Sequence, residues 1–343
     1  MSVLSTRFTE RFAVAHPFAC AGMAFAGGTP DLAAAVSGAG GVGAVGAALL
    51  PAEGLREIIR AVRERVGDAP FGINLITYFD TAEPVRVCAE ERVPIVSFHW
   101  GHPPADQLER LHQAGISVWE QVGGAEAAGI AVDDGAEVVI AQGWEAGGHN
   151  YGGLPAMVGV PAVVDAVGDR AQVLAAGGIT DGQQVAAALC LGADGVWVGT
   201  RLLASPEAQV HPEHHGRLLR ARGEDTVRSA VFGREWPEFN PMRVQRNRVV
   251  AEWNDRLDEI PAPGDARERI GTLSFQGEET VLRKFGVLPP LPGTEADWEE
   301  TPWLMGQGVG LVREVKPAAE IVGEMMREAE RTLARVRGEG AGS

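Results

Sequence analysis

The sequence has little of what usually holds a small secreted domain together. Its 343 residues include only three cysteines, Cys20, Cys88 and Cys190, and no CxxC pair. An odd number of widely separated cysteines argues against a disulfide framework and against a zinc site. We therefore expect no metal, and we expect a protein of the reducing cytoplasm.

Long apolar runs are also missing. No run approaches the roughly 18 uninterrupted apolar residues of a transmembrane helix, and Arg7 and Arg11 interrupt any signal-peptide pattern at the N-terminus. The net charge is -16, with no basic stripe, which disfavours nucleic acid and anionic membranes as partners. An anionic ligand must therefore be held by local groups such as backbone amides and helix N-termini.

Short apolar runs are abundant, by contrast, and most are separated by amphipathic stretches with helical spacing. The run of Leu55, Ile58, Ile59, Val62 and Val66 follows the i, i+3, i+4 rule. The spacing between apolar runs is about 20 to 35 residues, the size of a βα unit. The expected strands are 18–21, 42–46, 71–76, 95–99, 116–122, 138–141, 173–176 and 196–199.

Eight buried strands that alternate with helices favour a closed (β/α)8 TIM barrel, of the α/β class, over an open doubly wound sheet. No GxGxxG follows the first strand, and the glycine-rich stretch 38–43 precedes a strand, which is the wrong context for a dinucleotide fingerprint. We predict that residues 1–206 form the barrel and that residues 207–300 form a mainly helical insertion after strand 8. Residues 301–343 then complete the barrel with a helix over 317–336.

The insertion is expected to cover the barrel mouth, either as a lid or as the surface of a possible homodimer. Five aromatic residues are candidates for the rim of the pocket, with packing in the core or at an interface as an equal explanation. They are Trp100, Trp144, Tyr151, Trp236 and Trp303.

Two glycine-rich turns stand where a barrel commonly binds phosphate. Gly177 and Gly178 follow the seventh strand, before a helix whose N-cap is Asp181, and Gly199 and Thr200 follow the eighth. Backbone N–H groups and a helix N-terminus at such turns hold phosphate without any lysine. Tight turns alone would also explain the glycines, but the pair of turns in one barrel favours phosphate binding.

His149 is the candidate catalytic residue. It follows two glycines on the loop after the sixth strand, and its imidazole exchanges a proton near neutral pH, which suits a general base or a hydrogen-bond donor to an anion. Glu145 on the same loop is expected to anchor the loop through backbone hydrogen bonds. For the other histidines, packing or solvent exposure is favoured at His99 and His102, and an exposed loop at 211–215.

The stretches AQGWEAGGH at 141–149, AAGGI at 175–179, GVWVGTRLLAS at 195–205 and GQGVGLV at 306–312 resemble the nitronate monooxygenase family, formerly called 2-nitropropane dioxygenases. Support comes from FGINL at 71–75 and VSFHWG at 96–101, so the resemblance spans nearly the whole barrel. It implies an FMN-dependent barrel enzyme in which His149 is catalytic and Gln307 closes over the flavin. The implied FMN-binding residues are Met23, Asn74, Gln142, Gly147, Gly178, Trp197, Val198, Gly199 and Thr200.

The reaction implied is oxidation of an alkyl nitronate, or of a nitroalkane, by O2 to a carbonyl compound and nitrite. His149 would either stabilise the nitronate anion or take the α-proton of the neutral nitroalkane. Two alternatives stay open. One is an FMN-dependent NAD(P)H enoyl-thioester (enoyl-ACP) reductase, which shares the EAGGH loop, and the other is a flavin-binding protein without turnover.

Overall fold

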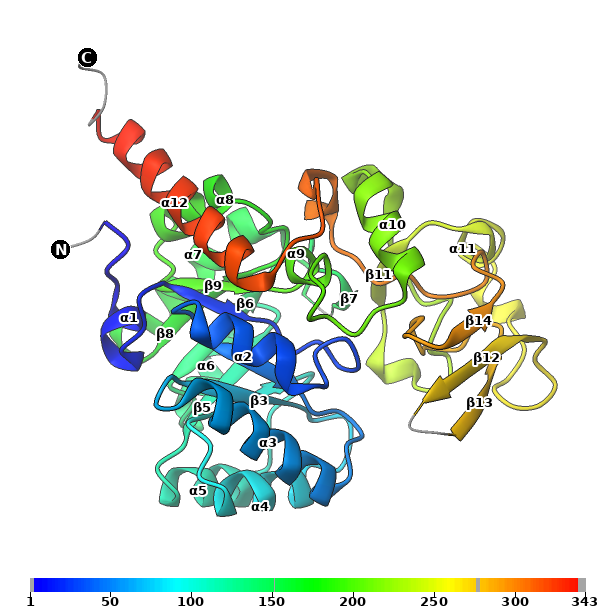
Figure 1. Ribbon diagram of the computed structural model, residues 1–343, viewed down its shortest axis with the longest axis horizontal. Helices are drawn as coiled ribbons and strands as arrows, with labels where there is room; N and C mark the ends of the chain where they lie inside the picture. Colours follow the sequence, from blue (N-terminus) through cyan, green and yellow to red (C-terminus); the bar gives the residue numbers. More distant parts are fainter. Residues whose placement is uncertain (1–2, 151, 276–277, 339–343) are drawn as a thin grey trace.

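Eight parallel strands form the centre of the molecule, and helices surround them (Figure 1). The computed structural model describes residues 3–150, 152–275 and 278–338. The predicted barrel is confirmed, and every expected strand is present within one or two residues. The barrel strands are β1 (Phe18–Cys20), β2 (Gly43–Gly46), β3 (Phe71–Ile76), β4 (Ile95–His99), β5 (Ser117–Val122), β6 (Val138–Gln142), β8 (Gln172–Ala176) and β9 (Gly195–Val198).

The strands are in the order β1-β9-β8-β6-β5-β4-β3-β2, and every neighbouring pair is parallel. A parallel bridge between Ala19 and Val42 joins the two ends of this order, so that the sheet closes. The backbone N–H of Cys20 donates to the Val42 carbonyl at 2.8 Å, and the Val42 N–H donates to the Phe18 carbonyl at 2.9 Å.

A helix follows each barrel strand, as the amphipathic stretches predict. The last helix, α12, lies along α8 and α2 and completes the ring. The helices are α1 (Arg7–Phe12), α2 (Pro30–Gly38), α3 (Ala52–Val66), α4 (Ala82–Glu90), α5 (Ala105–Gln113), α6 (Ala125–Asp133), α7 (Ala156–Val167), α8 (Gly182–Cys190), α9 (Thr200–Leu203) and α12 (Ala318–Val336), with a 3₁₀ turn η1 (Gly168–Arg170).

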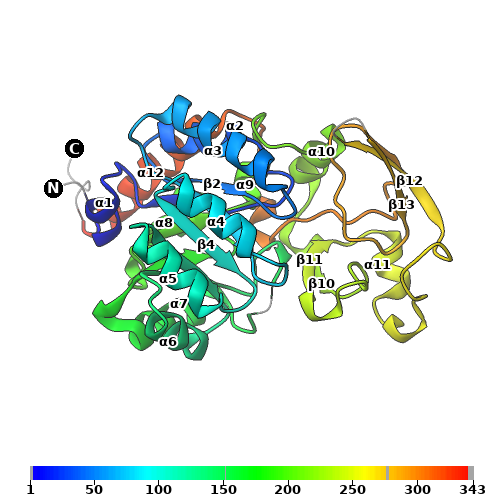
Figure 2. The same ribbon diagram turned by 90° about the horizontal axis from the view of Figure 1, so that it is seen from below.

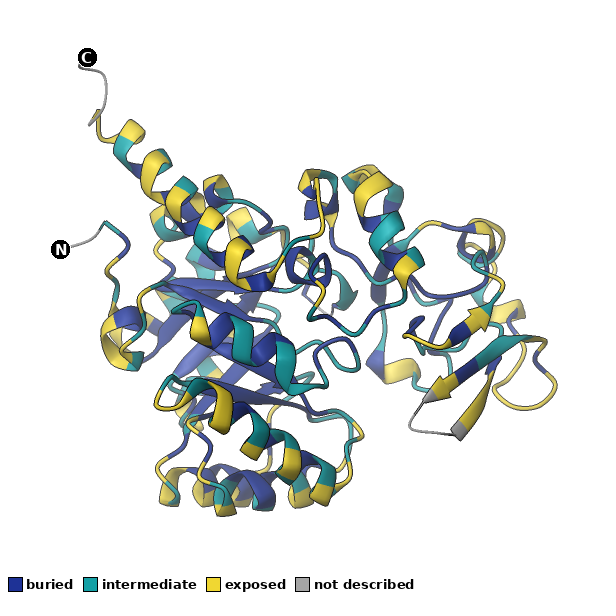
Figure 3. Ribbon diagram, viewed as in Figure 1, coloured by how far each residue is buried: buried dark blue, intermediate teal, exposed yellow. Residues whose placement is uncertain are grey.

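Side chains fill the barrel interior, and the helix-facing sides of the strands carry a second apolar layer. The barrel strands are buried over most of their length (Figure 3). Helix α1 closes the N-terminal end of the barrel, because Phe8 packs edge-on against Trp119 at 5.7 Å and Trp119 in turn packs against Trp197 at 6.0 Å. The C-terminal ends of the strands are left for the loops that carry functional residues.

The segment between β9 and α12 gathers at one end of the molecule, away from both termini (Figures 1 and 2). It does not match the expected mainly helical insertion, because it contains five strands: β12, β13 and β14 form one sheet, and β10 and β11 form a second sheet with β7 (Gly148–His149) of the loop after β6. Its elements are α10 (Pro212–Arg220), η2 (Gly223–Asp225), β10 (Thr226–Ser229), η3 (Pro237–Phe239), β11 (Met242–Gln245), α11 (Arg248–Trp253), η4 (Leu257–Glu259), β12 (Arg269–Phe275), β13 (Glu278–Arg283), β14 (Thr294–Ala296) and η5 (Gln307–Leu311).

The short strands of the insertion are not predicted from the sequence because they carry charged residues and are partly exposed to solvent. In β13 the sequence is EETVLR, and the side chain of its Val281 is 41% exposed. Such a strand lacks the continuous apolar run by which a buried strand is recognised. No helix of the described residues is long and apolar enough to cross a membrane.

Candidate active site

A cavity of about 220 Å³ opens at the C-terminal ends of the barrel strands. Barrel loops form one side of it, and residues of the insertion form the other. His149 lines the cavity, and so do eight of the nine residues expected to bind cofactor: Met23, Asn74, Gln142, Gly147, Gly178, Trp197, Gly199 and Thr200.

Val198 is the exception, and the cause is the alternation of side chains along β9. Trp197 points into the barrel interior, where it packs among inward-facing residues. Val198, the next residue, is fully buried in the layer between strands and helices. Its side chain is therefore not part of the cavity wall.

The turn after β8 lines the cavity with glycine backbone. Gly177 and Gly178 have φ angles of +100° and +73°, which glycine adopts without strain. Within the described residues, the N–H groups of Gly178 and Ile179 donate to no acceptor. This turn therefore offers two unused donors to an anion.

The helix N-terminus behind this turn contributes less than expected. Asp181 is the N-cap of α8, as predicted, and its carboxylate accepts from the N–H groups of Gln183 and Gln184. The Gly182 N–H donates to Glu328 at 2.9 Å. Because these side chains already occupy the first amides of the helix, the glycine turn supplies the donors that remain.

Thr200, after β9, faces the same region. Its Oγ1 accepts a hydrogen bond from the Gly306 N–H at 2.9 Å, which leaves the hydroxyl hydrogen to donate. Gly306 also lies against Gly147, and a Cβ added to Gly147 would stand 2.4 Å from the Gly306 nitrogen. The loops 143–148 and 305–308 are thus in backbone contact, which only glycine permits at this point.

Two amide side chains lie deeper in the cavity. Asn74 on β3 is buried, and its Nδ2 donates to the Ser97 hydroxyl at 2.9 Å. Gln142 at the end of β6 donates from Nε2 to the His149 carbonyl at 3.1 Å, while its Oε1 is buried without a partner among the described residues. A buried acceptor without a donor is costly, so this oxygen marks a place where a ligand N–H or O–H belongs.

His149 is held by the insertion as well as by the barrel. It lies on β7 (Gly148–His149), which pairs antiparallel with β11 rather than with a barrel strand. Its Nδ1–H donates to the backbone carbonyl of Phe239, in the insertion. A carbonyl can only accept, so the proton of the neutral imidazole is on Nδ1 and the lone pair is on Nε2.

The surroundings of His149 keep it neutral. Its ring stacks on the Phe239 ring with centroids 3.5 Å apart, and Trp100 packs edge-on at 6.0 Å. Burial lowers the pKa of His149 to about 4, and the hydrogen bond to Phe239 opposes that shift only in part. At neutral pH His149 is therefore a proton acceptor at Nε2.

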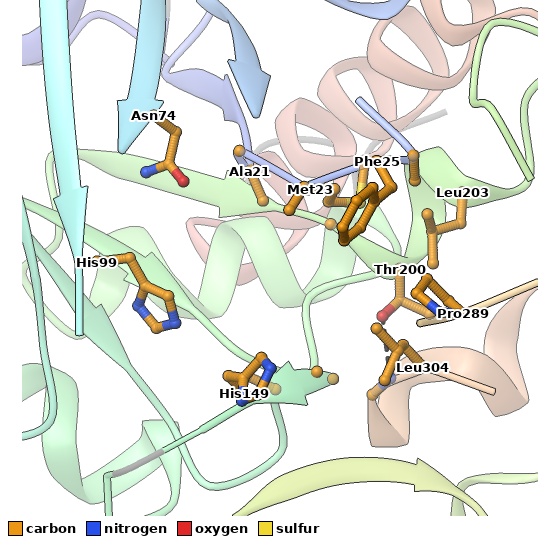
Figure 4. A pocket seen from close by; sticks show the side chains of 18 of the residues that line it. Ala21, Met23, Phe25, Asn74, His99, His149, Thr200, Leu203, Pro289 and Leu304 are labelled. Atoms are coloured by element: carbon orange, nitrogen blue, oxygen red, sulfur yellow. Dashed lines mark hydrogen bonds between the residues drawn. The ribbon is translucent and has the colours of Figure 1, made fainter. Parts of the chain in front are cut away.

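His99 is the second imidazole in the cavity, and its tautomer is the opposite one. Its Nδ1 accepts from the Gln121 amide at 2.8 Å, and burial, with a smaller effect of His149, lowers its pKa to about 3. The neutral ring therefore carries its proton on Nε2. Figure 4 shows His99, His149 and Asn74 on one side of the cavity.

The comparisons with known proteins agree with this geometry. The model of the nitronate monooxygenase family matches residues 5–86 and 76–328. The chain belongs to the nitronate monooxygenase family. A nitronate monooxygenase of Pseudomonas aeruginosa is 30% identical, over 95% of this chain and 99% of that protein. The putative monooxygenase Rv1533 of Mycobacterium tuberculosis is 35% identical, over 72% of this chain and 62% of that protein.

Solved structures extend the likeness over almost the whole chain. FabK from Thermotoga maritima has a TM-score of 0.80 at 33% identity and covers 98% of this chain and 99% of its own. The nitroalkane oxidase from Streptomyces ansochromogenes has a TM-score of 0.77 at 25% identity and covers 96% and 99%. The chain is therefore an enzyme of the oxidoreductase class, which sets aside a flavin-binding protein without turnover.

In this family member, Glu145 anchors its loop, as expected. Its two carboxylate oxygens accept from the Ala156 N–H at 3.2 and 3.0 Å. The side-chain amide of Asn150 adds hydrogen bonds to the carbonyls of Gly143, Trp144 and Ala146 at 3.1, 3.0 and 3.2 Å. The loop that carries His149 is thus fixed by its own polar side chains.

Three further histidines differ from the expectation of an exposed loop. His211, His214 and His215 belong to α10 and its N-cap rather than to an exposed loop. His214 is buried, lines the cavity and bonds to the Leu304 carbonyl through Nε2 at 3.1 Å. His102 pairs with the buried Glu120 at 2.5 Å, outside the cavity.

The aromatic residues expected at the rim of the pocket lie in different places, and so does Gln307. Trp236 lines the cavity, Trp100 contacts His149, and Trp303 is fully buried. Trp144 is 40% exposed beneath the guanidinium of Arg228, and Tyr151 lies outside the described residues. Gln307 is exposed and does not line the cavity, although its neighbours Gly306 and Gly308 do.

Sequence reasoning missed the apolar wall that the insertion gives to the cavity. The segment VLPPLPG at 287–293 is apolar and proline-rich within an otherwise charged insertion, and this contrast was the signal available. The insertion residues in the wall that no sequence pattern singled out are Val210, Phe239, Val287, Pro289, Pro290 and Leu291.

Proposed function

We propose that this enzyme holds FMN and oxidises alkyl nitronates, and nitroalkanes by way of their nitronates, with O2 to carbonyl compounds and nitrite. The observation that carries the proposal is the neutral His149, whose unprotonated Nε2 belongs to a cavity that also contains a phosphate-type glycine turn. Membership of the nitronate monooxygenase family supports it.

The residues present fit FMN. The N–H groups of Gly178 and Ile179 and the hydroxyl of Thr200 are neutral donors for its phosphate, and the buried Gln142 Oε1 requires a donor such as a flavin N–H or a ribityl hydroxyl. Asn74 and Met23 would lie against the same cofactor. When bound, FMN supplies the electron acceptor and the reaction with O2.

The chain itself supplies proton transfer and charge stabilisation. His149 takes the α-proton of the nitroalkane at Nε2, and the Phe239 carbonyl stabilises the cationic imidazole that results. His99 lines the same cavity with a neutral ring, so it adds no charge that would oppose protonation of His149. The aromatic surroundings of His149 strengthen its interaction with the Phe239 carbonyl.

A second candidate is the reduction of an enoyl thioester by NAD(P)H, also with FMN. The apolar, uncharged outer wall of the cavity favours it, because an acyl chain would be buried there without loss of a polar contact. The two functions differ in their electron donor, so they are separable by one assay.

The test uses the purified flavin-containing protein with butyl nitronate and with 1-nitrobutane, each in air and under nitrogen. We expect nitrite and butanal in air, and bleaching of the flavin absorbance under nitrogen. If neither nitrite nor bleaching is observed, the nitroalkane assignment is wrong. Steady NADPH consumption with a crotonyl thioester, combined with no reaction of 1-nitrobutane, would establish the second candidate instead.

A further inference from the structure

The carbonyl that orients His149 belongs to a segment of the insertion that contacts the loops at the C-terminal end of the barrel. We call residues 236–241 the covering segment, and it contains the Phe239 carbonyl. Its C-terminal end is fixed, because the Asn150 N–H donates to the Pro241 carbonyl at 3.1 Å and β11 follows directly. The position of the Phe239 carbonyl also depends on what holds the segment before that point.

A tryptophan of the barrel holds the residue that precedes Phe239. The indole Nε1–H of Trp100, in the loop after β4, donates to the Glu238 carbonyl at 2.8 Å. The indole also packs edge-on against the rings of Phe239 and His149, whose centroids lie 5.0 and 6.0 Å away. The carbonyls of Glu238 and Phe239 are separated by one Cα and by planar peptide groups, so a restraint on the first limits the directions open to the second.

The loop that carries Trp100 is held in a strained conformation. Trp100 has a φ angle of +71°, in the left-handed region that bulky residues rarely adopt. The Thr77 N–H donates to the His99 carbonyl at 2.9 Å, and the Thr77 hydroxyl donates to the Trp100 carbonyl at 2.5 Å. Backbone strain is retained where the surrounding structure imposes it, and it is common at functional sites. Here it accompanies the contact between the indole and the covering segment.

Tyr78 contacts the same segment in a different way. Its hydroxyl donates to the Glu238 carboxylate at 3.2 Å, and its ring stacks on the Phe239 ring with centroids 5.4 Å apart. Glu238 is exposed, so a hydrogen bond to its carboxylate can be exchanged for one to water at little cost. The Tyr78 hydroxyl therefore restrains a flexible side chain, whereas the Trp100 indole restrains the main chain.

Resting on the proton transfer proposed above, we propose that Trp100 is a positioning residue for His149. Its indole N–H restrains the Glu238 carbonyl, and thereby the Phe239 carbonyl that accepts from Nδ1–H of His149. When this restraint is lost, the Phe239 carbonyl moves away from Nδ1 in part of the molecules, and the imidazole proton can move to Nε2. An imidazole with its proton on Nε2 has no lone pair there to take the α-proton of a nitroalkane.

Two substitutions separate this role from simple packing. Trp100→Phe keeps an aromatic ring at the same backbone position, but it removes the N–H that donates to the Glu238 carbonyl. Tyr78→Phe is the matched control, because it keeps the stacked ring and removes a hydroxyl that donates to the Glu238 side chain. Each change removes one hydrogen bond to the same residue, but the first removes a bond to the main chain and the second a bond to the side chain.

The first experiment measures flavin reduction by stopped flow under nitrogen, with 1-nitrobutane and with preformed butyl nitronate. In Trp100→Phe we expect the limiting rate with 1-nitrobutane to fall about three- to tenfold, the change in population that one net hydrogen bond produces. The preformed nitronate needs no proton abstraction, so its limiting rate should stay at the wild-type value, and Tyr78→Phe should retain both rates. An unchanged rate in Trp100→Phe, equal losses with the two substrates, or equal losses in the two variants would reject the positioning role.

The second experiment determines the tautomer of His149 without turnover, by nitrogen NMR of the flavin-containing protein with isotope-labelled histidine. The His149 signals are assigned by comparison with the spectrum of His149→Asn. We expect the imidazole proton on Nδ1 in the wild type and in Tyr78→Phe, and partly on Nε2 in Trp100→Phe. If no nitro compound is oxidised but this shift is observed, the proposed reaction is wrong and the role of Trp100 stands. A proton on Nε2 in the wild type, or an unchanged tautomer in Trp100→Phe, would overturn the inference even if nitroalkanes are oxidised.

Discussion

The two walls of the cavity are made in different ways. The barrel wall contains glycine backbone and neutral polar side chains, such as Gly178, Asn74 and Gln142, in addition to apolar side chains such as Phe25. The insertion wall consists of apolar side chains, such as Phe239, Pro289 and Leu291. One wall is suited to a polar cofactor, and the other to an apolar substrate.

This difference separates two kinds of specificity. Backbone N–H groups and glycines recognise a shape and a charge that do not change from turnover to turnover. Apolar side chains recognise the size of a ligand. One apolar side chain can be substituted by another at little cost, provided that the total volume is preserved. The two walls meet at His149, which is attached to both, since β7 continues the barrel loop and pairs with β11.

The largest effect is expected where the walls meet. His149→Asn should lower kcat/KM for neutral 1-nitrobutane by about 10²- to 10⁴-fold, the usual contribution of a general base. The flavin content, measured from the visible spectrum, should stay at the wild-type value. Turnover of preformed butyl nitronate should fall much less, and an equal loss for both substrates would contradict the assignment of His149 as the base.

A change on the barrel wall should affect the cofactor before the substrate. In Gly147→Ala the new Cβ would stand 2.4 Å from the Gly306 nitrogen, and overpacking of this kind costs about 1–3 kcal/mol. We expect flavin affinity, measured by fluorescence on dilution, to fall about ten- to hundredfold.

Gly153→Ala is the matched control for that variant, because Gly153 lies on the same connection and has open space around its Cβ position. It should retain the wild-type flavin affinity. If both variants lose flavin alike, the contact between the loops 143–148 and 305–308 does not determine cofactor binding.

A change on the insertion wall should affect catalysis and leave the flavin in place. Phe239→Leu keeps the carbonyl that accepts from His149 but removes the stacked ring. A stacked pair contributes about 0.5–1.5 kcal/mol, so kcat/KM should fall by about two- to tenfold. Stopped-flow measurement of flavin reduction tests this, and loss of flavin from the variant would contradict the division between the walls.

The smallest expected effect is the change of the rate with pH in the neutral range. Burial lowers the pKa of His149 to about 4, so the ring is neutral throughout the range from pH 6 to 8. Protonation reaches it only as the pH falls towards 4, and the rate with neutral 1-nitrobutane should therefore be flat above pH 6 and decline in acid. An inflection of kcat/KM near 6.5 would show that His149 is not buried against Phe239 in the working enzyme.

The barrel could be predicted from the sequence because each of its strands and helices is marked by residues that are adjacent in the sequence. An apolar run such as 138–141 is a strand, and the capping box at Asp181 marks the start of α8. The order of strand ends then brings His149 and the two glycine turns together. The alternation of side chains along a strand would also have excluded Val198 from the expected FMN-binding residues, since the neighbouring Trp197 points into the barrel.

The insertion could not be predicted because its contacts are distant in sequence. The partner of His149 is the carbonyl of Phe239. Every residue has a backbone carbonyl, so the residue type does not indicate this contact. His214 looked like part of a polar loop, yet it is buried against Leu304, 90 positions later. Strands as short as β10 and β11 gain their stability from pairing rather than from an apolar run.

The pairing of β7 with β11 also bears on how the enzyme matures. The last barrel strand, β9, ends at Val198, whereas the imidazole of His149 acquires its tautomer only from Phe239, a residue made later. Because synthesis proceeds from the N-terminus, all eight barrel strands are made before this hydrogen bond can form. During synthesis the nascent chain would pass through a stage that has its cofactor turns but no oriented base, so activity begins only when the last third of the polypeptide docks.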